Sequence, residues 1–415
     1  MKKQKNFSIL LISPFFHPHK GGSQRYMEEL YAHMHTKHPG IKIDVLAYNT
    51  DHARKKEWYR GMTISRIPCW QILPGQFAIP SPISLIRWLH SHKTYDIVHT
   101  HIRFFDATWW VWAYAKLIGA TSVFTEHVAS HPIHEREYVT FIARVIDETI
   151  ARWSISRYDC ITATNKSTRT FLKYVMGVQK TVYLTYGGVD TMFFSPKRGL
   201  RRRIPHVTRT FGNADTIIAY AGRIIWSKGM TYFYRAVRDS ITSLPRRVYV
   251  VFAGPGDLLP DIQEEIVKDR LEDRIFTTGS LEAREVRSLL RATDIFVHPS
   301  HHNEGFPNVI LEAGATENFV IATQNAGVEE AMTDKKTGLI IEQKNEADMR
   351  RTIRWAVEHP DERRNMAKAL RKTMRRKFEW KNLSERFYLL LTRSRIHRAV
   401  GENLSRQILK TFALS

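Results

Sequence analysis

Two glutamates, Glu304 and Glu312, stand eight positions apart on either side of a proline. Paired carboxylates are the usual means of breaking a glycosidic bond, and a glycosidase needs them roughly 5 to 9.5 Å apart. If the residues between them were all helical, eight positions would span about 12 Å, which is too far. We therefore expect the two carboxylates to contact different parts of one elongated ligand.

The residues between the two glutamates predict the start of a helix. Pro307 suits the first turn of a helix, because it lacks the N–H group that would have no partner there. The main-chain N–H groups of Asn308 and Val309 would then lie at the helix N-terminus, where unpaired donors and the helix dipole attract an anion such as phosphate. An ordinary loop and helix would explain the same residues, so other motifs are needed to decide between that reading and an anion site.

Arg223 and Lys228 form a second candidate anion site. The segment TIIAYAGRIIWSKGM places Arg223 at the end of a predicted strand and Lys228 at the opening of the next helix. Two cations in such a loop can converge on one anion, although either could be a surface charge. Fixed cations of this kind stabilise negative charge that develops on a bound anion during a reaction.

Two further candidates follow predicted strands in the first half of the chain. Gly21 and Gly22 precede a helix expected to start near Ser23, and two glycines let a backbone approach an anion closely. His127 closes the strand TSVFTEH, where a side chain can reach a ligand, although a lone histidine is more often structural. His131 is a neighbour without an assigned purpose, and His99 and His101 alternate onto one face of the strand DIVHTH.

Composition and charge narrow the class of protein. The chain has 415 residues and two cysteines, Cys69 and Cys160, without a disulfide framework or metal-ligand spacing, which favours a reducing cytoplasmic setting. The aromatic run from Phe104 to Ala120 falls short of the roughly 20 residues that a membrane span requires. The 63 Lys and Arg residues exceed the 41 Asp and Glu residues, for a formal net charge of +22. Such an excess attracts polyanions or anionic lipid headgroups, although solvated helix faces explain part of it.

Apolar runs alternate with amphipathic ones along the chain, and this pattern then restarts. It predicts two α/β domains of the Rossmann type, each a mostly parallel sheet covered by helices. In such sheets ligands bind beyond the carboxyl ends of the strands, so two facing domains would hold a substrate in the cleft between them. The predicted strands, in order, are FSILLIS, IKIDVLAY, MTISRIP, DIVHTH, TSVFTEH, DCITATN and TVYLTYG, then TIIAYAGR, RVYVVFAGPG, RIFTTG, DIFVHPS, FVIATQN and TGLIIEQ.

The domain boundary is predicted in the Arg-rich segment between Phe194 and Asp215. The first domain would comprise residues 1–194 and the second residues 195–384. Residues 385–415 would contain a helix whose apolar set, Phe387, Leu389, Leu390 and Leu391, favours burial over a frayed basic tail.

The motifs together resemble a known family. A carboxylate, seven residues and a second carboxylate, with GFPNVILEA between and after them, are similar to the signature of retaining nucleotide-sugar glycosyltransferases of family 4, which have the GT-B fold. The segments PFFHPHKGG, YLTYGGVDTMFFSP, AGPGD, TGSL and AGVEEAMTDKKTGLII also match, closely from Tyr183 to about Ile341. This chain departs from the family pattern at two places. Where the family usually has an asparagine before GVD, this chain has Tyr186 and Gly187, and where the family usually has a glycine, this chain has Asn318. We expect Asn318 to adopt the left-handed turn in its place.

The resemblance implies that residues 385–415 join the first domain, because the last helix of this fold typically packs back on it. It also assigns roles to the candidate residues. It implies that Glu304, His127, Arg223 and Lys228 are catalytic, with Glu304 against the transferred sugar and His127 positioning that sugar. Arg223 and Lys228 would hold the diphosphate, and Glu312 the ribose hydroxyls. The implied donor-binding set is completed by Gly21, Gly22, Gly305, Phe306, Pro307, Asn308 and Val309.

The predicted reaction moves a sugar from a nucleotide-diphosphate sugar to an acceptor hydroxyl with retention. We expect neither a cofactor nor a metal, since the D-x-D motif of metal-dependent enzymes is absent. The GFPNV loop slightly favours a UDP-sugar, and charge and aromatic content suggest a glycan or lipid-linked acceptor at the inner face of a membrane, with no nucleic-acid partner. A sugar-nucleotide 2-epimerase on the same fold and a non-catalytic basic polyanion-binding protein are the alternatives.

Overall fold

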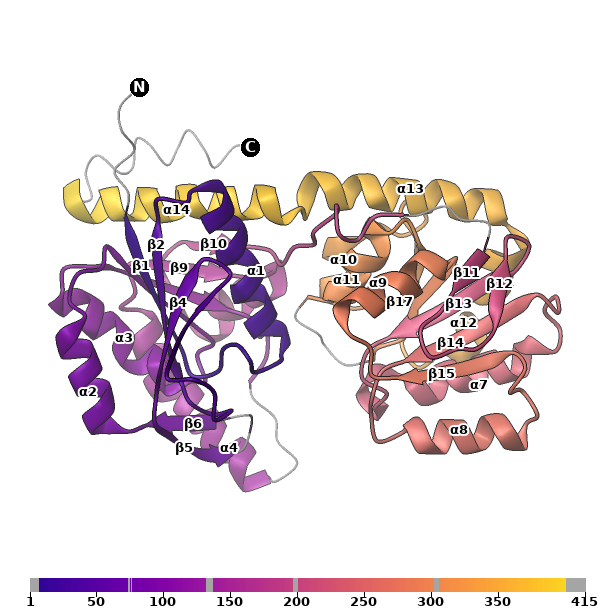
Figure 1. The fold of residues 1–415 in the computed structure, drawn as a ribbon, viewed down its shortest axis with the longest axis horizontal. Helices are drawn as coiled ribbons and strands as arrows, with labels where there is room; N and C mark the ends of the chain where they lie inside the picture. The colour runs from indigo at the N-terminus through magenta and orange to yellow at the C-terminus, as the bar shows by residue number, and fades with distance from the viewer. Residues whose placement is uncertain are drawn as a thin grey trace. The chain divides into compact units, whose positions relative to one another are not determined.

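The chain folds into two compact units, shown in a computed structural model that describes residues 7–73, 75, 77–131, 137–196, 201–301 and 306–400. Unit 1 comprises Met1–Gly187 and Trp380–Ser415, and unit 2 comprises Gly188–Glu379 (Figure 1). The boundaries therefore fall after residues 187 and 379, where the sequence pattern places them after residues 194 and 384. The Arg-rich segment expected at the boundary lies inside unit 2, where Arg201–Arg203 (β11) pairs with Thr210–Gly212 (β12) as an antiparallel hairpin.

Unit 1 is built on an eight-stranded sheet in the order β10-β9-β8-β7-β1-β2-β4-β3. All neighbours are parallel except β3 and β4. The strands are β1 (Ser8–Ser13), β2 (Lys42–Tyr48), β3 (Lys56–Tyr59), β4 (Met62–Ile67), β7 (Ile97–His101), β8 (Thr121–Glu126), β9 (Cys160–Ala163) and β10 (Val182–Leu184), and a separate hairpin is formed by β5 (Cys69–Leu73) and β6 (Phe77–Pro80).

Helices cover both faces of this sheet, because successive side chains of a strand point to opposite faces and both sets are apolar. Leu10 and Ile12 lie in one core with α3 and α5, whereas Ile9 and Leu11 lie in the other core with α1 and α14. The helices are α1 (Gly22–Lys37), α2 (Pro82–Ser91), α3 (Asp106–Leu117), α4 (Glu137–Ile146), α5 (Arg152–Ile155), α6 (Lys166–Thr170) and α14 (Trp380–Val400), with π-helical turns η1 (Asp147–Ala151) and η2 (Phe171–Val175).

Unit 2 is built on a six-stranded parallel sheet in the order β15-β14-β13-β16-β17-β18. Its strands are β13 (Thr216–Ala221), β14 (Val248–Ala253), β15 (Ile275–Gly279), β16 (Ile295–His298), β17 (Phe319–Thr323) and β18 (Leu339–Ile341). Every strand that the sequence pattern predicts is therefore present in one of the two large sheets.

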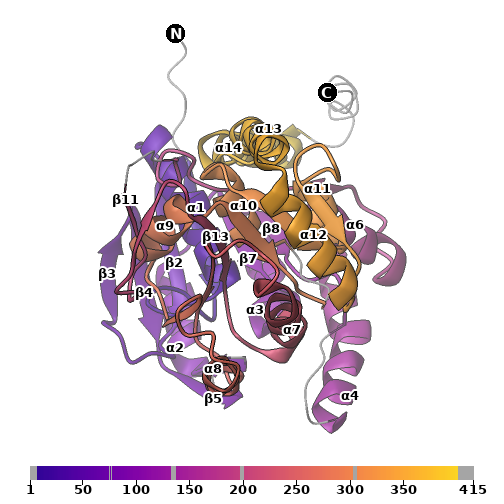
Figure 2. The same cartoon turned by 90° about the vertical axis from the view of Figure 1, so that its right-hand side faces the viewer.

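The helices of unit 2 form layers on both faces of its sheet (Figure 2). One core is shared with α7, α8, α12 and Ala367 of α13. Helix α9 contacts β13, and α10 and α13 contact β17. The bounds are η3 (Trp226–Lys228, a 3₁₀ turn), α7 (Met230–Ile241), α8 (Leu259–Lys268), α9 (Ala283–Ala292), α10 (Asn308–Ala315), α11 (Ala326–Ala331), α12 (Glu346–Glu358) and α13 (Pro360–Lys377).

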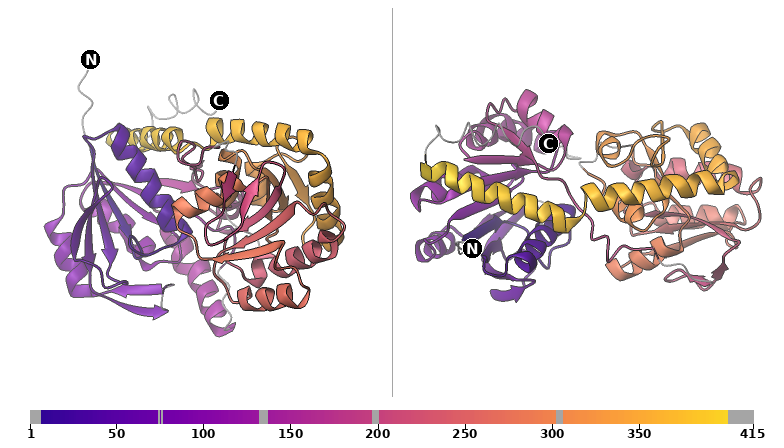
Figure 3. Two further views of the ribbon diagram at one scale, coloured as in Figure 1. Left: turned by 45° about the vertical axis from the view of Figure 1, so that its right-hand side comes forward. Right: turned by 90° about the horizontal axis from the view of Figure 1, so that it is seen from above.

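Helix α14 returns the end of the chain to unit 1, where it contacts α1 (Figure 3). Its buried side chains, Trp380, Leu383, Phe387, Tyr388 and Leu391, recur at the three- and four-residue spacing of one helical face. Leu389, which the sequence pattern includes in the apolar set, is instead 41% exposed. It lies on the other face of the helix, and Tyr388 takes its place against the core.

The turn after α10 differs from the sequence expectation. Glu317 adopts the left-handed conformation, with φ of 67°, and Asn318 does not. The reason is that Asn318 is buried and its side-chain amide donates hydrogen bonds to the carbonyls of Leu290 and Thr293, at 2.9 and 2.8 Å. The asparagine thus anchors β17 to the end of α9, and the residue before it makes the turn.

Within the described part of the chain, none of the helices combines the length and apolar character needed to cross a membrane.

Candidate active site

The candidate residues of unit 2 gather where two loops leave the sheet in opposite directions. Strand β13 lies between β14 and β16, the chain continues from β13 through α7 to β14, and from β16 through α10 to β17. This is a topological switch point, where an open α/β sheet leaves a crevice beyond its carboxyl ends. Arg223 and Lys228 lie on the first of these loops, and Asn308, Val309 and Glu312 follow the second.

A close backbone contact joins the two loops. Gly229 has a left-handed φ of 73°, and a Cβ atom there would overlap the carbonyl of Pro299, just after β16. Hydrogen bonds reinforce the contact, because the Ser227 carbonyl accepts from the His301 N–H and the Ser300 hydroxyl, both at 3.3 Å. The turn that carries Lys228 is therefore fixed against the segment that leads to α10.

Arg223 lies on a rigid loop but has an exposed side chain. The Tyr220 hydroxyl donates to the Arg223 carbonyl at 2.8 Å. Behind the loop, Gly254 approaches the carbonyl of Gly222 so closely that a Cβ atom would overlap it. The backbone is thus held while the guanidinium faces solvent, as anion binding requires. Lys228 is half-buried in the 3₁₀ turn, just before α7 rather than in its first turn.

Helix α10 places the next candidates at the same edge of the sheet. It begins at Asn308, so the N–H groups of Asn308 and Val309 belong to its first turn, where no intrahelical acceptor exists. Pro307 precedes the helix with φ of −80° and ψ of 92°, so it is the N-cap residue rather than the first helical residue. Glu312 is 5% exposed, one turn into the helix.

Packing fixes the helix. A Cβ atom at Gly314 would lie 2.9 Å from Leu370, so α10 and α13 are in close contact. The rings of Phe306 and Phe378 lie 5.3 Å apart, which holds the residue just before the helix. Glu304 and Gly305 lie outside the described residues, so their predicted roles stay predictions.

One aromatic residue at this edge is absent from the sequence-based candidates. Trp226 is 58% exposed and stands in the same turn as Lys228, with its ring edge-on to His301 at 4.4 Å. The ammonium of Lys344 lies 5.7 Å from the centre of the Trp226 ring. The signal available in the sequence was a tryptophan between Arg223 and Lys228, in a segment predicted to be a loop.

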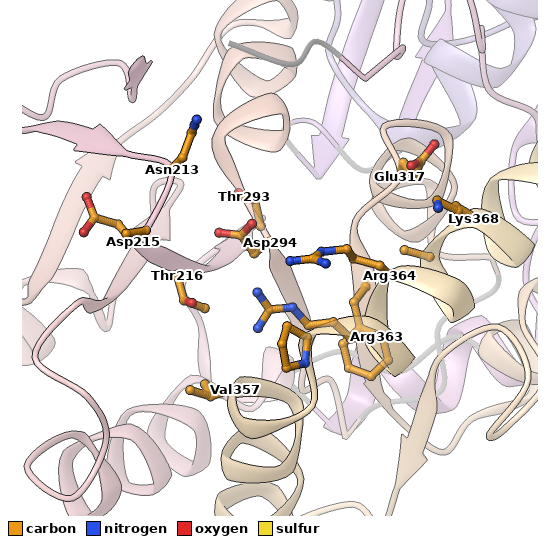
Figure 4. A pocket seen from close by; sticks show the side chains of 14 residues that line it. Asn213, Asp215, Thr216, Thr293, Asp294, Glu317, Val357, Arg363, Arg364 and Lys368 are labelled. Atoms are coloured by element: carbon orange, nitrogen blue, oxygen red, sulfur yellow. The ribbon is translucent and has the colours of Figure 1, made fainter. Parts of the chain in front are cut away.

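A cavity of about 340 Å³ in unit 2 lies elsewhere (Figure 4). Among its lining residues, Thr216 begins β13, Asp294 precedes β16 and Phe319 begins β17. The cavity is therefore at the amino ends of the strands, opposite the edge that carries Arg223, Lys228 and α10. We assign the candidate site to the carboxyl edge, because the cations and the helix N-terminus are there.

In unit 1, the glycine pair lies at the start of α1. Gly21 is the N-cap residue and Gly22 is the first helical residue, one position earlier than the sequence predicts. Both are exposed, and a Cβ atom at Gly22 would meet nothing within 4 Å. The protein itself therefore leaves open space above the first turn of a 16-residue helix.

His127 follows β8 at the same edge of unit 1, in a cluster of aromatic side chains. Its Nε2 atom is 2.9 Å from Nδ1 of His101, and the ring of Tyr26 packs edge-on at 4.9 Å. Burial lowers the pKa of His127 to about 4, although the neighbouring Glu126 carboxylate acts in the opposite direction. The imidazole is therefore neutral at pH 7 and suited to hydrogen bonding rather than to carrying charge.

His99 and His101 support His127 and are themselves fully buried. His99 contacts the Tyr31 hydroxyl at 2.5 Å and the Thr125 hydroxyl at 2.7 Å, and burial lowers its pKa to about 3. Burial also holds the pKa of His101 well below 6.5. The alternation that places both histidines on one face is confirmed, but that face contacts α1 and Phe387 of α14.

A buried ion-pair network that no sequence motif predicts fixes the loop that carries His127. The Arg103 guanidinium contacts Glu126 at 3.1 Å and Asp147 at 2.6 Å, and it also donates to the carbonyls of Val128 and Ser130. Glu126 in turn accepts from the N–H groups of His127 and Val128, at 2.7 and 3.0 Å.

His131 belongs to the same network, because its Nδ1 atom is 2.7 Å from Asp147. An isolated arginine in an aromatic run gave no pattern from which this network could be inferred. Only the tertiary structure brings β7, β8 and η1 together around it.

Replacing Arg103 should destabilise unit 1 strongly. An Arg103→Met change leaves two buried carboxylates without their cation, which costs about 3 to 5 kcal/mol. Urea unfolding would measure this loss. Arg144→Met is the matched control, because Arg144 pairs with the exposed Glu148 at 2.8 Å and its loss should have no measurable effect. Equal stability of Arg103→Met and wild type would contradict the structural role given to the network.

The buried histidines predict a loss of stability in acid. The folded-state pKa values of His99 and His127 lie below 6.5, so the unfolded chain binds more protons between pH 6.5 and about 4. The free energy of unfolding should therefore fall as pH decreases through that window.

His99→Asn should reduce this dependence between pH 7.5 and 5 by up to about 2 kcal/mol, measured by urea unfolding at each pH. The groups that face the cluster, Tyr26, Tyr31 and Glu126, remain in this variant. The exposed His90→Asn should keep the wild-type slope. An unchanged slope in His99→Asn would show that the cluster does not control acid stability.

Comparison with known proteins connects these sites to a family. Residues 20–193 match the family described as Glycosyltransferase Family 4, and residues 207–373 match the family described as Glycosyl transferases group 1. An uncharacterized glycosyltransferase of Methanocaldococcus jannaschii is 21% identical over 91% of this chain and 96% of that protein. The GPI3 subunit of phosphatidylinositol N-acetylglucosaminyltransferase from Saccharomyces cerevisiae is 22% identical over 92% of this chain and 81% of that protein.

Solved structures show the same fold. Sucrose-phosphate synthase from Thermosynechococcus elongatus superposes with a TM-score of 0.71, at 18% identity over 93% of this chain and 98% of that chain. Anabaena HepE in complex with UDP superposes with a TM-score of 0.69, at 14% identity over 93% and 99%. The two family matches together span most of the chain, and the chain therefore belongs to glycosyltransferase family 4 and has the GT-B fold.

Proposed function

We propose that this glycosyltransferase moves a sugar from a nucleotide-diphosphate sugar to an acceptor hydroxyl with retention of configuration. The observation that supports the proposal most strongly is the junction of the two loops of unit 2. There the loop that carries Arg223 and Lys228, held by backbone contacts, meets the segment that leads to a helix N-terminus. Such an arrangement binds a diphosphate and stabilises the charge that grows on it as the sugar leaves.

Each residue of unit 2 has a distinct part in this proposal. Arg223 and Lys228 hold the diphosphate, and the N–H groups of Asn308 and Val309 bind a phosphate or sugar oxygen. Glu312 accepts hydrogen bonds from the ribose hydroxyls. Phe306 and Pro307 fix the entry to the helix, and Glu304 with Gly305 faces the transferred sugar. Because these cations take the role that a divalent metal ion has in other enzymes, we expect turnover to persist in the presence of a metal chelator.

Unit 1 contributes the remaining groups. The exposed amides at Gly21 and Gly22 bind the donor diphosphate or the acceptor, with open space above Gly22 for the ligand. His127, held neutral and oriented by His101 and by the Arg103 network, donates or accepts a hydrogen bond at the sugar. A neutral imidazole serves this purpose without repelling or attracting the charged diphosphate.

The sugar and acceptor are proposed from the relatives and from the charge of the chain. Similarity to subunits of phosphatidylinositol N-acetylglucosaminyltransferase favours transfer of a hexose or an N-acetylhexosamine. The GFPNV loop favours UDP as the nucleotide. The net charge of +22 supports a lipid-linked or cell-surface glycan acceptor, met by peripheral contact with an anionic membrane at its cytoplasmic face.

A panel of nucleotides and sugar nucleotides tests the donor site by thermal shift. A nucleoside diphosphate at a hundred times its Kd should stabilise the protein by about 2.7 kcal/mol and raise Tm by roughly 5 °C or more. Arg223→Ala and Lys228→Ala should reduce the shift, and each should lower turnover by roughly 10² to 10³. The exposed Lys268→Ala in the same unit is the control and should change neither. No response to any sugar nucleotide would contradict the proposal.

Glu304→Ala should abolish transfer while leaving the fold and much of the nucleotide affinity intact, because its proposed contact is with the sugar rather than the nucleotide. Turnover, Tm and the nucleotide-induced shift would be measured on the same preparation. Glu358→Ala, at the end of α12, controls for loss of a carboxylate elsewhere in unit 2. Wild-type turnover in Glu304→Ala would remove this residue from the mechanism. Consumption of donor without acceptor in the wild type would indicate an epimerase instead.

A further inference from the structure

Trp226 is an exposed aromatic side chain at the edge of the sheet that carries the candidate donor site. In the part of unit 2 that the structure describes, the exposed large apolar side chains are Met192, Trp226 and Val267. Met192 precedes β11, and Val267 lies near the end of α8, which leads to the amino end of β15. Trp226 is therefore the one among them that stands on a loop at the carboxyl edge.

Hydrogen bonds of the backbone hold Trp226 in this position. On one side, the Ile224 N–H donates to the Pro255 carbonyl at 2.8 Å, on the loop after β14. On the other side, the Gly229 N–H donates to the Trp226 carbonyl at 2.9 Å, and Gly229 is itself in close contact with the Pro299 carbonyl. The exposure of the ring therefore comes from a fixed loop.

The contacts of the Trp226 ring show on which side of the switch point it lies. Its centre is 4.4 Å from that of the His301 ring and 5.7 Å from the Lys344 ammonium. His301 follows β16 and Lys344 follows β18, and both strands lie on the same side of β13. The backbone next to Arg223 is held from the other side, by Gly254 after β14. The ring thus lies on the β16 side of the loop.

This position is beside one end of the proposed diphosphate. A diphosphate bound by Arg223 and Lys228 carries the nucleoside at one end and the sugar at the other. His301, which packs against Trp226, is three positions before Glu304, the residue proposed to face the transferred sugar. The ring is therefore on the side of the loop from which the sugar would be contacted.

The chemistry of a tryptophan side chain suits a sugar ring. The C–H groups of a hexopyranose form an apolar face with a slight positive charge, and the face of an indole is apolar with a partial negative charge. The Lys344 ammonium beside the ring can donate hydrogen bonds to the hydroxyls at the rim of the same sugar. An indole offers no comparable contact to a diphosphate, which needs cations.

We propose that Trp226 is a positioning residue for the donor, with its ring stacked on the C–H face of the transferred hexopyranose. This deepens the proposed function and rests on it for the presence of a nucleotide sugar. Stacking fixes the plane of the sugar ring and so holds the anomeric carbon in line with the diphosphate bound by Arg223 and Lys228. Trp226 thus recognises the sugar half of the donor, and the two cations recognise the charged half.

Isothermal titration calorimetry of the full chain tests this role, with UDP, UDP-glucose and UDP-N-acetylglucosamine as probes. In Trp226→Ala, the Kd of the better-bound sugar nucleotide should rise about tenfold, because loss of a stacked ring reduces affinity by that order. The Kd of UDP should not change, so the ratio of the two Kd values is the readout. Trp226→Phe keeps an aromatic ring and should restore most of the wild-type ratio.

Trp58→Ala is the matched control. Trp58 is 73% exposed in β3 and pairs with Thr63, near the amino end of β4. Its loss removes an exposed tryptophan from unit 1, at the edge of the sheet opposite to the candidate residues, and neither Kd should change. The Tm of each variant without ligand is measured on the same preparation.

Three results would overturn the role of Trp226 alone. An equal rise in the Kd of UDP and of the sugar nucleotide would show that the ring stacks on the base. Unchanged Kd values in Trp226→Ala would show that the ring contacts no part of the donor. A lower Tm in Trp226→Ala, with the wild-type ratio of Kd values, would show a structural role. Failure of the wild type to bind any of the probes would instead contradict the proposed transfer reaction, and this role with it.

Discussion

The turn that carries Lys228 can close against the end of β16 only because residue 229 lacks a side chain. The carbonyl of Pro299 occupies the space that a Cβ atom would need, and φ of 73° is itself costly for other residues. The sheet beneath is apolar on both faces, so polar groups that act on a ligand are confined to its edge. The contact at Gly229 thus brings polar groups of two loops to that edge. It joins the loop that carries Arg223 and Lys228 to the segment that leads to α10.

At the carboxyl edge of the sheet in unit 1, the charged side chains are arranged differently from those in unit 2. There the charged groups, Arg103, Glu126 and Asp147, are buried and paired with one another, and the candidate group beside them is the neutral imidazole of His127. The ions hold the loop in place, and the histidine offers a hydrogen bond without a charge. Unit 2 reverses this arrangement, since Arg223 is exposed, Lys228 is half-buried, and their loop is held by backbone contacts.

Two amphipathic helices of unit 1 show that one sequence pattern can have opposite outcomes. The apolar residues of α14 recur along one face and are buried against α1 and the sheet. Those of α4 recur in the same way and point outward, because the opposite side of α4 is fixed by Ala143 and by Asp147 in the Arg103 network. The periodicity of apolar residues shows which side chains share one face of a helix. The contacts made by the opposite face determine whether those side chains point to the core or to solvent.

The amino-acid sequence was enough to predict the class of fold, the parallel strands of both large sheets, the cations Arg223 and Lys228 after a strand end, and the family, because alternation, breakers and local motifs are short-range properties. Tertiary structure decided the rest. Asn318 anchors two distant carbonyls and so leaves the left-handed turn to Glu317, Leu389 is exposed by the rotation of α14, and His99 and His101 face the core. The short antiparallel strands β3, β5, β6, β11 and β12 went unpredicted, since partners rather than their own patterns define them. The Arg103 network likewise joins residues that only folding brings together, so no spacing along the chain predicts it.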